Sequence, residues 1–383
     1  MINNRGFSEA AAKKIKTSQS ILYTPAAAGK WSYSHHAQIT EFKGKLYAMW
    51  SSGRTHEDLY GQRVMMSKSE NGVDWEVPTP LFDTMLGENV EGTLTAAGFH
   101  VFGDTLYAYA GYYERLIENA IPCYWSDYYE KIKDQVVLAP GNNKNTRLYS
   151  ISTTDGENWS PLRDIGLPMV PNLSPQKTAS GRLIIPGNFM FPYTDDPTGQ
   201  NGWVKTGLFP KEDAPKIIDN MEYSGDFCEG SLMQTDDGVL HMLLRSGWID
   251  PETNYLAVST SYDNGETWSC PERTEFTDDY TKFFTGRLPD GRYFIVSNPV
   301  THTRGIREGR RCPLVLSLSD NGEDFRDFYI IEDKKIPMQY AGLCKVGIYG
   351  YPHATIWNNK MYVIYSINKE QVAVTSFDLA QLR

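Results

Sequence analysis

A short phrase of sequence returns six times along this chain: a turn centred on Gly or Asn, followed at once by a short apolar strand. The turns are centred on Gly44, Gly103, Gly181, Gly238, Gly291 and Asn359. Gly and Asn suit tight hairpins because they tolerate positive φ. Recurrence at intervals of roughly 50 to 80 residues indicates a repeat architecture of small sheets. That architecture takes precedence over the two or three ordinary domains that 383 residues would otherwise suggest.

A second phrase alternates with the first. Residues Ser261–Trp268 read SYDNGETW and match the pattern S-x-D-x-G-x-x-W in full. Weaker copies occupy Ser67–Trp75, Ser152–Trp159 and Ser317–Phe325, and one unit between Trp159 and Ser261 lacks the phrase. In each copy we expect the Asp or Asn to cap the turn between two strands. The aromatic ring is expected to fill the space between neighbouring sheets.

Together the two phrases predict an all-β fold in a single domain, residues 1–383: a β-propeller whose blades are four-stranded antiparallel sheets. We count six blades, and seven would fit if an irregular blade lay within the inserted regions. The last blade lacks an outer strand, which the N-terminal SQSILYTPA can supply, so pairing of the N- and C-terminal strands closes the ring. An inserted segment at about 114–145 is expected to form a rim or lid. The segment WVKTGLF (203–209) is expected to be the third strand of the third blade.

Composition and charge restrict the partners. The formal net charge is −10, which argues against nucleic acid because nucleic-acid binding requires a basic surface. The five cysteines include no CxxC pair and are expected to be free thiols. The sequence shows no apolar stretch of membrane-spanning length, and its N-terminus lacks the apolar core of a signal peptide. We therefore expect a cytoplasmic protein, or a secreted or periplasmic one whose signal peptide has been removed. The sequence leaves the oligomeric state open.

The propeller layout places the candidate functional residues at one face. The loops after each second strand are long and polar, and the first residues of each inner strand point towards the axis. The starts of the inner strands offer His35, His36, Glu91, Asn172, Gln176, Glu229, Lys282, Arg287, Tyr351 and His353. The ends of the second strands and the loops that follow add Arg54, Glu57, Arg63, Tyr112, Tyr113, Asn188, Arg245, Asn298, Asn368 and Lys369. Such a ring of His, Arg, Tyr and carboxylates suits a carbohydrate that bears a carboxylate.

The histidine pair has two interpretations. Adjacent residues of a strand point to opposite faces, so at most one of His35 and His36 is expected to face the channel, where it could act as a general base. Alternatively, the ring only satisfies buried backbone groups. His353 is expected to meet the pair across the ring closure. A metal held by these three histidines is the minority hypothesis, because no HxH or HExxH spacing supports it.

The arginines carry similar alternatives. Arg63 and Arg245 could each bind a carboxylate through two parallel hydrogen bonds. Each could instead form an interblade salt bridge to a residue such as Glu57 or Glu229. Glu229 precedes an apolar strand and is expected to be half-buried, either paired with an arginine or raised in pKa.

Two further groups are ambiguous. Tyr112 and Tyr113 could stack on a sugar or donate a proton, or they could pack between blades. An arginine-rich run is interpreted as a solvated loop and comprises Arg304, Arg307, Arg310 and Arg311.

The phrase at Ser261–Trp268 is similar to the Asp box of the sialidase-like superfamily, and the repeats cover nearly all of the chain. The early Arg-Ile-Pro motif, which supplies the first arginine of the sialidase carboxylate-binding triad, is absent. The nearest string, RLIIP at Arg182, lies within a predicted strand. The stretches SYSHHAQITEFKGKLYAMWSSG and GYPHATIW resemble instead the rhamnose–glucuronate lyases, the related α-L-rhamnosidases and, more distantly, ulvan lyases. This resemblance implies that His35 or His36 is the base. It implies that Arg63 or Arg245 binds the carboxylate and that Tyr112 or Tyr113 donates the proton.

Three functions are compatible with these residues. The first is a polysaccharide lyase that cleaves an acidic glycan by β-elimination at a rhamnose-capped glucuronate. The second is a glycoside hydrolase, either an α-L-rhamnosidase or a divergent exo-sialidase. It would require two carboxylates from Glu57, Glu91 and Glu229, or a Tyr–Glu nucleophile pair with an acid. The third is a non-catalytic glycan-binding propeller.

The lyase hypothesis assigns the roles as follows. The catalytic candidates are His35, His36, Tyr112, Tyr113 and Glu229. The substrate-binding candidates are Arg63, Arg245, Glu57, Glu91, Asn172, Asn298, Tyr351, His353 and Lys369. No cofactor or catalytic metal is expected. Calcium is the structural ion that the oxygen-rich central channel would favour.

Overall fold

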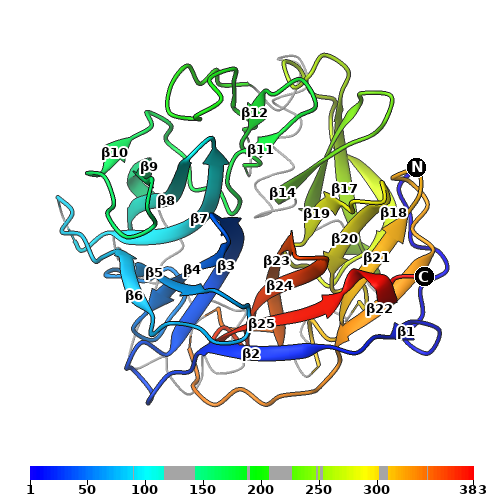
Figure 1. Ribbon diagram of the computed structural model, residues 1–383, viewed down its shortest axis with the longest axis horizontal. Helices are drawn as coiled ribbons and strands as arrows, with labels where there is room; N and C mark the ends of the chain where they lie inside the picture. The colour runs from blue at the N-terminus through cyan, green and yellow to red at the C-terminus, as the bar shows by residue number, and fades with distance from the viewer. Residues whose placement is uncertain are drawn as a thin grey trace.

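The structure is a computed structural model that describes residues 1–88, 90–115, 143–187, 190–206, 227–246, 249–250, 253–301, 309–342 and 344–383. These residues form six sheets arranged around a central axis (Figure 1). In each sheet the strands that follow the inner strand along the chain lie further from the axis, and two N-terminal strands join the outer edges of the fifth and sixth sheets. The all-β prediction is confirmed, whereas the number of blades and the closure of the ring remain predictions.

The first three sheets occupy the N-terminal half. The first contains β3 (Tyr33–Phe42), β4 (Lys45–Gly53), β5 (Arg63–Ser69) and β6 (Thr79–Phe82). The second contains β7 (Thr93–Phe102), β8 (Thr105–Arg115), β9 (Asn143–Thr153) and β10 (Arg163–Asp164). The third is short and contains β11 (Gln176–Lys177), β12 (Leu183–Ile184) and β13 (Tyr193–Thr194).

The other three sheets follow in chain order. The fourth contains β14 (Phe227–Gln234), β15 (Leu240–Ser246), β16 (Ile249–Asp250), β17 (Thr253–Ser261) and β18 (Glu272–Thr277). The fifth contains β19 (Phe284–Arg287), β20 (Tyr293–Ser297), β21 (Leu314–Ser319), β22 (Asp327–Glu332) and the N-terminal β1 (Lys13–Lys14). The sixth contains β23 (Tyr349–Trp357), β24 (Lys360–Ile367), β25 (Gln371–Asp378) and the N-terminal β2 (Ser18–Tyr23). A short 3₁₀ helix, Leu379–Gln381, ends the chain.

Two predictions about strands differ in outcome. Strand β2 pairs antiparallel with β25, as predicted for the two ends of the chain. The third strand of the third sheet is β13 rather than the predicted 203–209. Of that segment only Val204 pairs, through an isolated bridge to Tyr193, and residues 207–209 lie outside the described part. Most of the predicted rim segment at about 114–145 also lies outside it, as does Asn188.

The full copy of the second phrase has the predicted geometry. Asp263 Oδ1 accepts from the Thr267 amide at 2.9 Å and so caps the turn. Trp268 is 4% exposed and packs edge-on against Phe191 of the preceding sheet at 5.1 Å. The weaker copy at Ser152–Trp159 makes a similar contact. Its glycine, Gly156, has φ +77°, and a Cβ there would collide with the Tyr47 hydroxyl of the first sheet. The box therefore locks neighbouring sheets together as well as turning the chain.

Apolar side chains fill the spaces between neighbouring sheets. Six clusters of buried residues each join two adjacent sheets, and one of them joins the first sheet (Trp50, Ala48) to the last (Ile364, Val374). In the described part of the chain the apolar contacts therefore lie between blades rather than in one central core, and polar groups occupy the axis.

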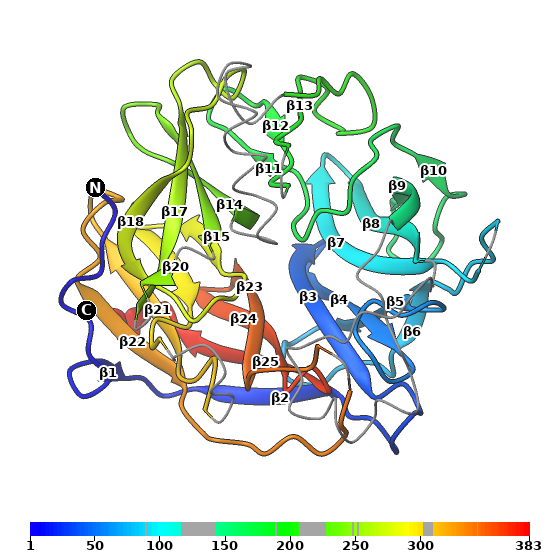
Figure 2. The same cartoon turned by 180° about the vertical axis from the view of Figure 1, so that it is seen from behind.

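The N-terminal segment passes along the outside of three sheets. Ile2 is 4% exposed and belongs to the cluster between the fourth and fifth sheets. Strand β1 then pairs parallel with β22, and β2 pairs with β25. Figures 1 and 2 show this blue segment running along one side of the molecule from both directions. We call residues 2–23 the N-terminal strap.

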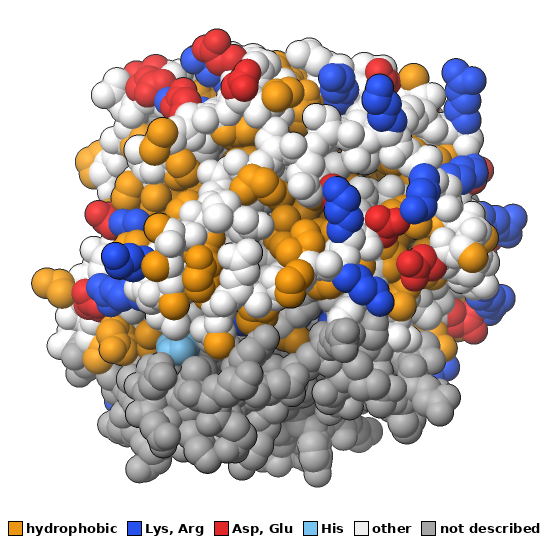
Figure 3. Space-filling model, turned by 90° about the horizontal axis from the view of Figure 1, so that it is seen from below, with side chains coloured by type: hydrophobic (Ala, Val, Ile, Leu, Met, Phe, Trp, Pro, Cys, Tyr) orange, Lys and Arg blue, Asp and Glu red, His pale blue; other side chains and the backbone are white. Residues whose placement is uncertain are grey.

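The outer surface mixes charges of both signs. In Figure 3, which shows the side near β2 and β25, basic and acidic side chains are interspersed with apolar ones over the part of the chain that is described. No helix formed by the described residues is long and apolar enough to cross a membrane.

Candidate functional site

Four inner strands carry a β-bulge near their start, and in β3, β14 and β23 the bulge holds a large polar side chain. The register shifts between His35 and Gln38 in β3, between Cys228 and Ser231 in β14, and between Gly350 and His353 in β23. A bulged residue adopts positive φ in each strand: His36 (+54°), Glu229 (+54°) and Tyr351 (+53°). Positive φ is costly for side chains of this size, and such strain clusters at functional sites. The bulges bring these three side chains together at the axis.

A tyrosine, a carboxylate and an arginine are hydrogen-bonded to one another in this place. The Tyr351 hydroxyl donates a short hydrogen bond to Glu229 Oε1. Arg245 Nη1 donates to Glu229 Oε2 at 2.6 Å and to the Tyr351 hydroxyl at 2.9 Å. The Arg245 guanidinium also stacks on the Tyr280 ring at 3.9 Å. We call Tyr351, Glu229 and Arg245 the tyrosine triad.

The electrostatics of the triad fix its protonation. Burial alone would raise the pKa of Glu229, but the Arg245 charge and the Tyr351 hydroxyl outweigh it, so the pKa lies below its usual value. Burial, followed by the negative charge of Glu229, holds the pKa of Tyr351 well above 10. At neutral pH the triad therefore contains a carboxylate placed to accept the proton of a neutral phenol.

Both histidines of the predicted pair reach the site. The His35 ring lies 3.9 Å from the Tyr351 ring between centroids, and the His36 ring lies 5.2 Å from it. The expectation that at most one faces the channel is wrong, because the bulge at His36 breaks the alternation of the strand. Burial lowers the pKa of His35 well below 6.5 and that of His36 to about 4, so both rings are neutral.

The hydrogen bonds of His35 define its tautomer. Ser366 Oγ donates to the Gly350 carbonyl at 3.3 Å, so it accepts from His35 Nδ1–H at 2.7 Å. Nε2 of His35 consequently carries a lone pair. That atom is buried and has no hydrogen-bond partner among the described residues. It is a free base beside Tyr351.

The loop after β4 adds two carboxylates. Glu57 accepts from Lys369 Nζ at 2.5 Å, and burial raises its pKa although Lys369 opposes this. Asp58 was missed by sequence reasoning. Its side chain is 29% exposed, it lies 3.7 Å from Arg115, and the Tyr113 hydroxyl is hydrogen-bonded to it. The local feature that distinguishes Asp58 is its positive φ (+56°), which the structure shows and the sequence does not.

The interpretation of the arginine run as a solvated loop is wrong for Arg310 and Arg311, which are 7% and 3% exposed. Asp279 accounts for this burial, because its backbone oxygen accepts from Arg310 and its carboxylate accepts from the Arg311 amide at 2.5 Å. The Arg311 guanidinium lies 5.4 Å from the Tyr351 ring centroid, and its Nε and Nη1 have no partner among the described residues. Arg304 and Arg307 lie outside the described part.

Several predicted residues hold other parts of the structure. Asn298 Nδ2 donates to the Arg311 and Pro313 carbonyls, so it shapes the turn that carries Arg311. The Asn172 carbonyl accepts from Gln38 at 2.6 Å.

Three more predicted residues are placed at the rim or within a blade. Arg63 stacks on Trp31 at 3.7 Å. Glu91 is held by Arg54 through two hydrogen bonds of 2.7 and 3.1 Å. The Tyr112 hydroxyl donates to Glu114 within the second sheet.

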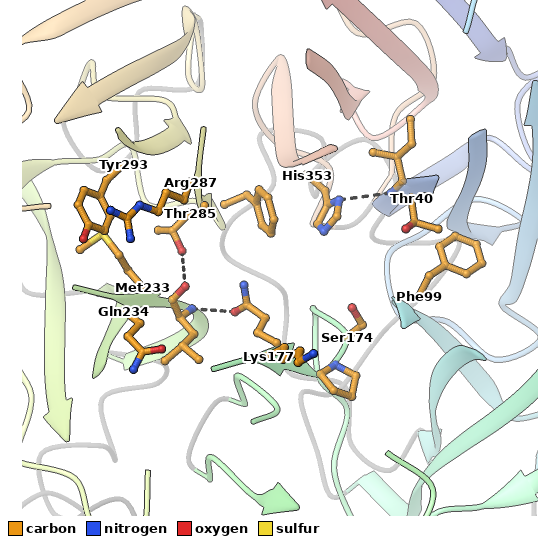
Figure 4. Close-up of a pocket in the computed structure, with 16 residues that line it drawn as sticks. Thr40, Phe99, Ser174, Lys177, Met233, Gln234, Thr285, Arg287, Tyr293 and His353 are labelled. Carbon is orange, nitrogen blue, oxygen red and sulfur yellow. Dashed lines mark hydrogen bonds between the residues drawn. The ribbon is translucent and has the colours of Figure 1, made fainter. Parts of the chain in front are cut away.

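His353 belongs to a different place. It lines a cavity of about 450 Å³. Figure 4 shows its ring together with other lining residues, including Thr40, Phe99, Lys177 and Thr285. Its ring lies 4.1 Å from that of Phe284, and its Nδ1 accepts from the Ile39 amide at 3.4 Å. The expected meeting of His353 with the histidine pair does not occur, because the bulge between Gly350 and His353 leaves only Tyr351 at the site.

Among the described residues, one group of side chains has donor atoms close enough for a metal ion. The ligand atoms of His35, His36 and Glu57 lie within 4.8 Å of one another. Two ring nitrogens with one carboxylate suit a transition metal better than calcium. The Lys369 ammonium already binds Glu57 and opposes a second cation there. Calcium in the channel remains a prediction.

The comparisons with known proteins agree with this architecture. The family description "BNR repeat-like domain" matches residues 44–364, and the chain belongs to this family. A structure described as "Sialidase" superposes with a TM-score of 0.64 at 18% identity, over 96% of this chain and 33% of that one. A Trypanosoma rangeli sialidase in complex with sialic acid superposes with a TM-score of 0.64 at 13% identity, over 97% of this chain and 60% of that one. A Dyadobacter fermentans protein of unknown function superposes with a TM-score of 0.63 at 15% identity, over 95% and 98%. No curated protein matches the chain.

At these identities the likeness shows the fold alone, and the chain spans only part of the sialidases. The repeat family predicted from the boxes is confirmed by the match to the BNR repeat-like domain, whereas action on a glycan remains a prediction. The predicted closeness to rhamnose–glucuronate lyases remains a prediction.

Proposed function

We propose that the protein is a retaining glycoside hydrolase of acidic glycans in which Tyr351 is the nucleophile and Glu229 its general base. The observation that carries this proposal is the short hydrogen bond from the buried Tyr351 hydroxyl to the ionised Glu229, which Arg245 holds in place. A tyrosine needs such a base because a free phenol is a poor nucleophile at neutral pH. Tyrosine nucleophiles are an established departure from the usual pair of carboxylates in glycosidases.

The reaction runs in two steps. Tyr351 Oη attacks the anomeric carbon while its proton passes to Glu229 Oε1. The bond to the leaving oxygen breaks, and that oxygen takes a proton from Asp58, the most exposed carboxyl near the pair. Water then attacks the anomeric carbon with Asp58 as base, and the departing Tyr351 oxygen recovers its proton from Glu229. Two inversions give net retention.

The charges around the triad support an anionic sugar. Arg245 Nε and two nitrogens of Arg311 are buried donors without a partner among the described residues. Buried guanidinium groups with free N–H donors suit a carboxylate, which they bind through charge-assisted hydrogen bonds. We infer that a sugar acid, such as a uronic acid, occupies the site with its carboxylate towards these arginines.

A second function, elimination at a uronate, is favoured by one observation: the free Nε2 lone pair of His35. In that reaction Nε2 takes the C5 proton of the uronate, and the electron pair forms the C4=C5 double bond. The C4–O bond breaks, and Tyr113, whose pKa burial raises well above 10, gives its proton to the leaving oxygen. Bound arginines would make the C5 proton acidic by neutralising the carboxylate.

One digestion experiment separates these functions. Acidic arabinogalactan or gum glycans are treated with wild type, Tyr351→Phe and His35→Asn, while released sugar and the absorbance of unsaturated uronate are followed. Hydrolysis gives sugar without absorbance and is lost in Tyr351→Phe. Elimination gives absorbance, is lost in His35→Asn and persists in Tyr351→Phe, which would refute the hydrolase. Binding of the glycan without release of any sugar would mean a non-catalytic propeller.

A further inference from the structure

A buried lysine beneath the tyrosine triad has no role so far. Lys282 lies between β18 and β19, and its side chain is among the largest that are fully buried. Its Nζ has no hydrogen-bond partner among the described residues. The same atom lies 5.9 Å from the centroid of the Tyr351 ring. A buried ammonium normally requires a partner, so its isolation calls for an explanation.

The charged and titratable groups that face Lys282 come from three inner strands. Glu229 on β14 is the group whose negative charge favours the ammonium. Tyr351 on β23 is the phenol whose ring Lys282 faces, and Arg311 and Lys369 lie 5.4 and 5.8 Å from the centroid of the same ring. The other neighbours are histidines, His35 and His36 on β3 and His353 on β23, and all three are neutral because burial lowers their pKa values. Lys282 is therefore attracted to the triad without being tied to one oxygen of it.

This freedom matters for the reaction proposed above. As the proton leaves Tyr351 for Glu229, the negative charge moves from the carboxylate to the phenol oxygen. A cation bonded to Glu229 alone would resist that movement. A cation near both groups, bonded to neither, favours the charge wherever it lies.

We propose that Lys282 is a positioning residue that stabilises the phenolate character of Tyr351 through space, and that its loss of a proton ends activity at alkaline pH. This inference rests on the proposed hydrolase. Burial, with Glu229 opposing it, lowers the pKa of Lys282 to about 7. The ammonium is thus present below that pH and lost above it, so turnover should fall along an alkaline limb that begins near neutrality.

The first test compares Lys282→Met, Lys282→Arg and a matched control, Lys345→Met. Lys345 is also buried, and its pKa is lowered to about 8, but it is hydrogen-bonded to the Ser32 and Tyr340 carbonyls rather than placed under Tyr351. At pH about 6 we expect Lys282→Met to lower kcat by about 10- to 100-fold, as a single charge at this distance allows. Lys282→Arg should move the alkaline limb to higher pH, because the guanidinium keeps its proton. Lys345→Met should leave the limb in place.

The second test does not require turnover. 3-Fluorotyrosine is placed at position 351, and its ¹⁹F shift is followed against pH in the wild-type, Lys282→Met and Lys282→Arg backgrounds. We expect the titration midpoint of the fluorophenol to lie about one to two pH units lower in Lys282→Arg than in the other two, because the phenol titrates above the pKa of Lys282, where only the guanidinium still carries a charge. An unchanged midpoint, with circular dichroism showing a folded protein, overturns the role of Lys282 even if the hydrolase is correct. Activity that survives Tyr351→Phe overturns the hydrolase, while the ¹⁹F result still reports on the lysine. If Lys282→Met does not fold, Lys282→Gln takes its place in both measurements.

Discussion

Removing one partner of the ion pair inside the tyrosine triad should lower the free energy of unfolding, because the pair is buried. Arg245 Nη1 lies 2.6 Å from Glu229 Oε2, and the two side chains are only 13% and 9% exposed. Arg245→Met keeps most of the volume and leaves the Glu229 carboxylate buried without its hydrogen-bonded counter-charge. Removing one partner of a buried pair costs about 3–5 kcal/mol, so the free energy of unfolding should fall by that amount at neutral pH. In the double variant Arg245→Met/Glu229→Gln much of this loss should be recovered, because the unpaired carboxylate is replaced by a neutral amide.

The pH dependence of the loss follows from the sign of the shift. In wild type the pKa of Glu229 is lowered, so its stabilisation is present above the unfolded pKa and is lost as pH falls through the folded pKa. In Arg245→Met the guanidinium is gone and burial raises the pKa instead. The penalty is then present at high pH and is relieved as pH falls through the raised pKa. The deficit of Arg245→Met should be smaller at about pH 5 than at about pH 8.

A surface pair provides the matched control. Arg54 Nη1 lies 2.7 Å from Glu91 Oε2, but the side chains are 40% and 30% exposed. Arg54→Met should therefore cost less than about 1 kcal/mol. Urea unfolding followed by tryptophan fluorescence measures all of these variants. A loss below about 1 kcal/mol in Arg245→Met, with no recovery in the double variant, would refute the account of the triad as a buried ion pair.

Three other predictions concern the blades and the charged site. Trp268→Ala should destabilise the protein by about 3–5 kcal/mol, and the less buried Trp159→Ala by less, as thermal melts would show; equal losses would contradict the interblade role of the box ring. The pKa of His36 is lowered to about 4, so stability is complete above pH 6.5 and is lost as pH falls towards 4, by about 3 kcal/mol for this group. His36→Asn, which tolerates positive φ, should flatten that acid dependence, and an unchanged slope would assign it to other groups. EDTA should leave the melting temperature unchanged, because the Lys369 ammonium already neutralises Glu57; a drop that zinc or calcium restores would reveal a resident ion.

The fold was predictable because its signals are local. A Gly-centred turn and a capped box are each determined by a few consecutive residues, so Gly156 and Trp268 occupy in the structure the box positions predicted from the sequence. The third sheet was harder to assign, because its strands are only two residues long.

The site was predictable as a collection of residues and not as an arrangement. Glu229, Arg245 and Tyr351 were each named as candidates, but the hydrogen bond that unites Tyr351 with Glu229 joins residues 122 positions apart. The bulges that orient Glu229 and Tyr351 depend on positive φ, which cannot be predicted from the residue types Glu and Tyr. Arg311 was misassigned because a run of arginines is usually solvated, and its burial depends on Asp279 in a distant loop.

The N-terminal strap has a mechanical consequence. A propeller whose blades contact only their neighbours could peel open one sheet at a time when its ends are pulled. Here the first 23 residues are anchored in the cluster between the fourth and fifth sheets, along β22 and along β25. Tension applied at the two ends is carried first by the Ile2 anchor and the β1–β22 pairing, because both lie before β2 in the chain, and only then by the β2–β25 ladder. The strap therefore adds attachments to two further sheets that must be released before the last sheet opens, and a chain that begins after residue 23 should release that sheet at lower force.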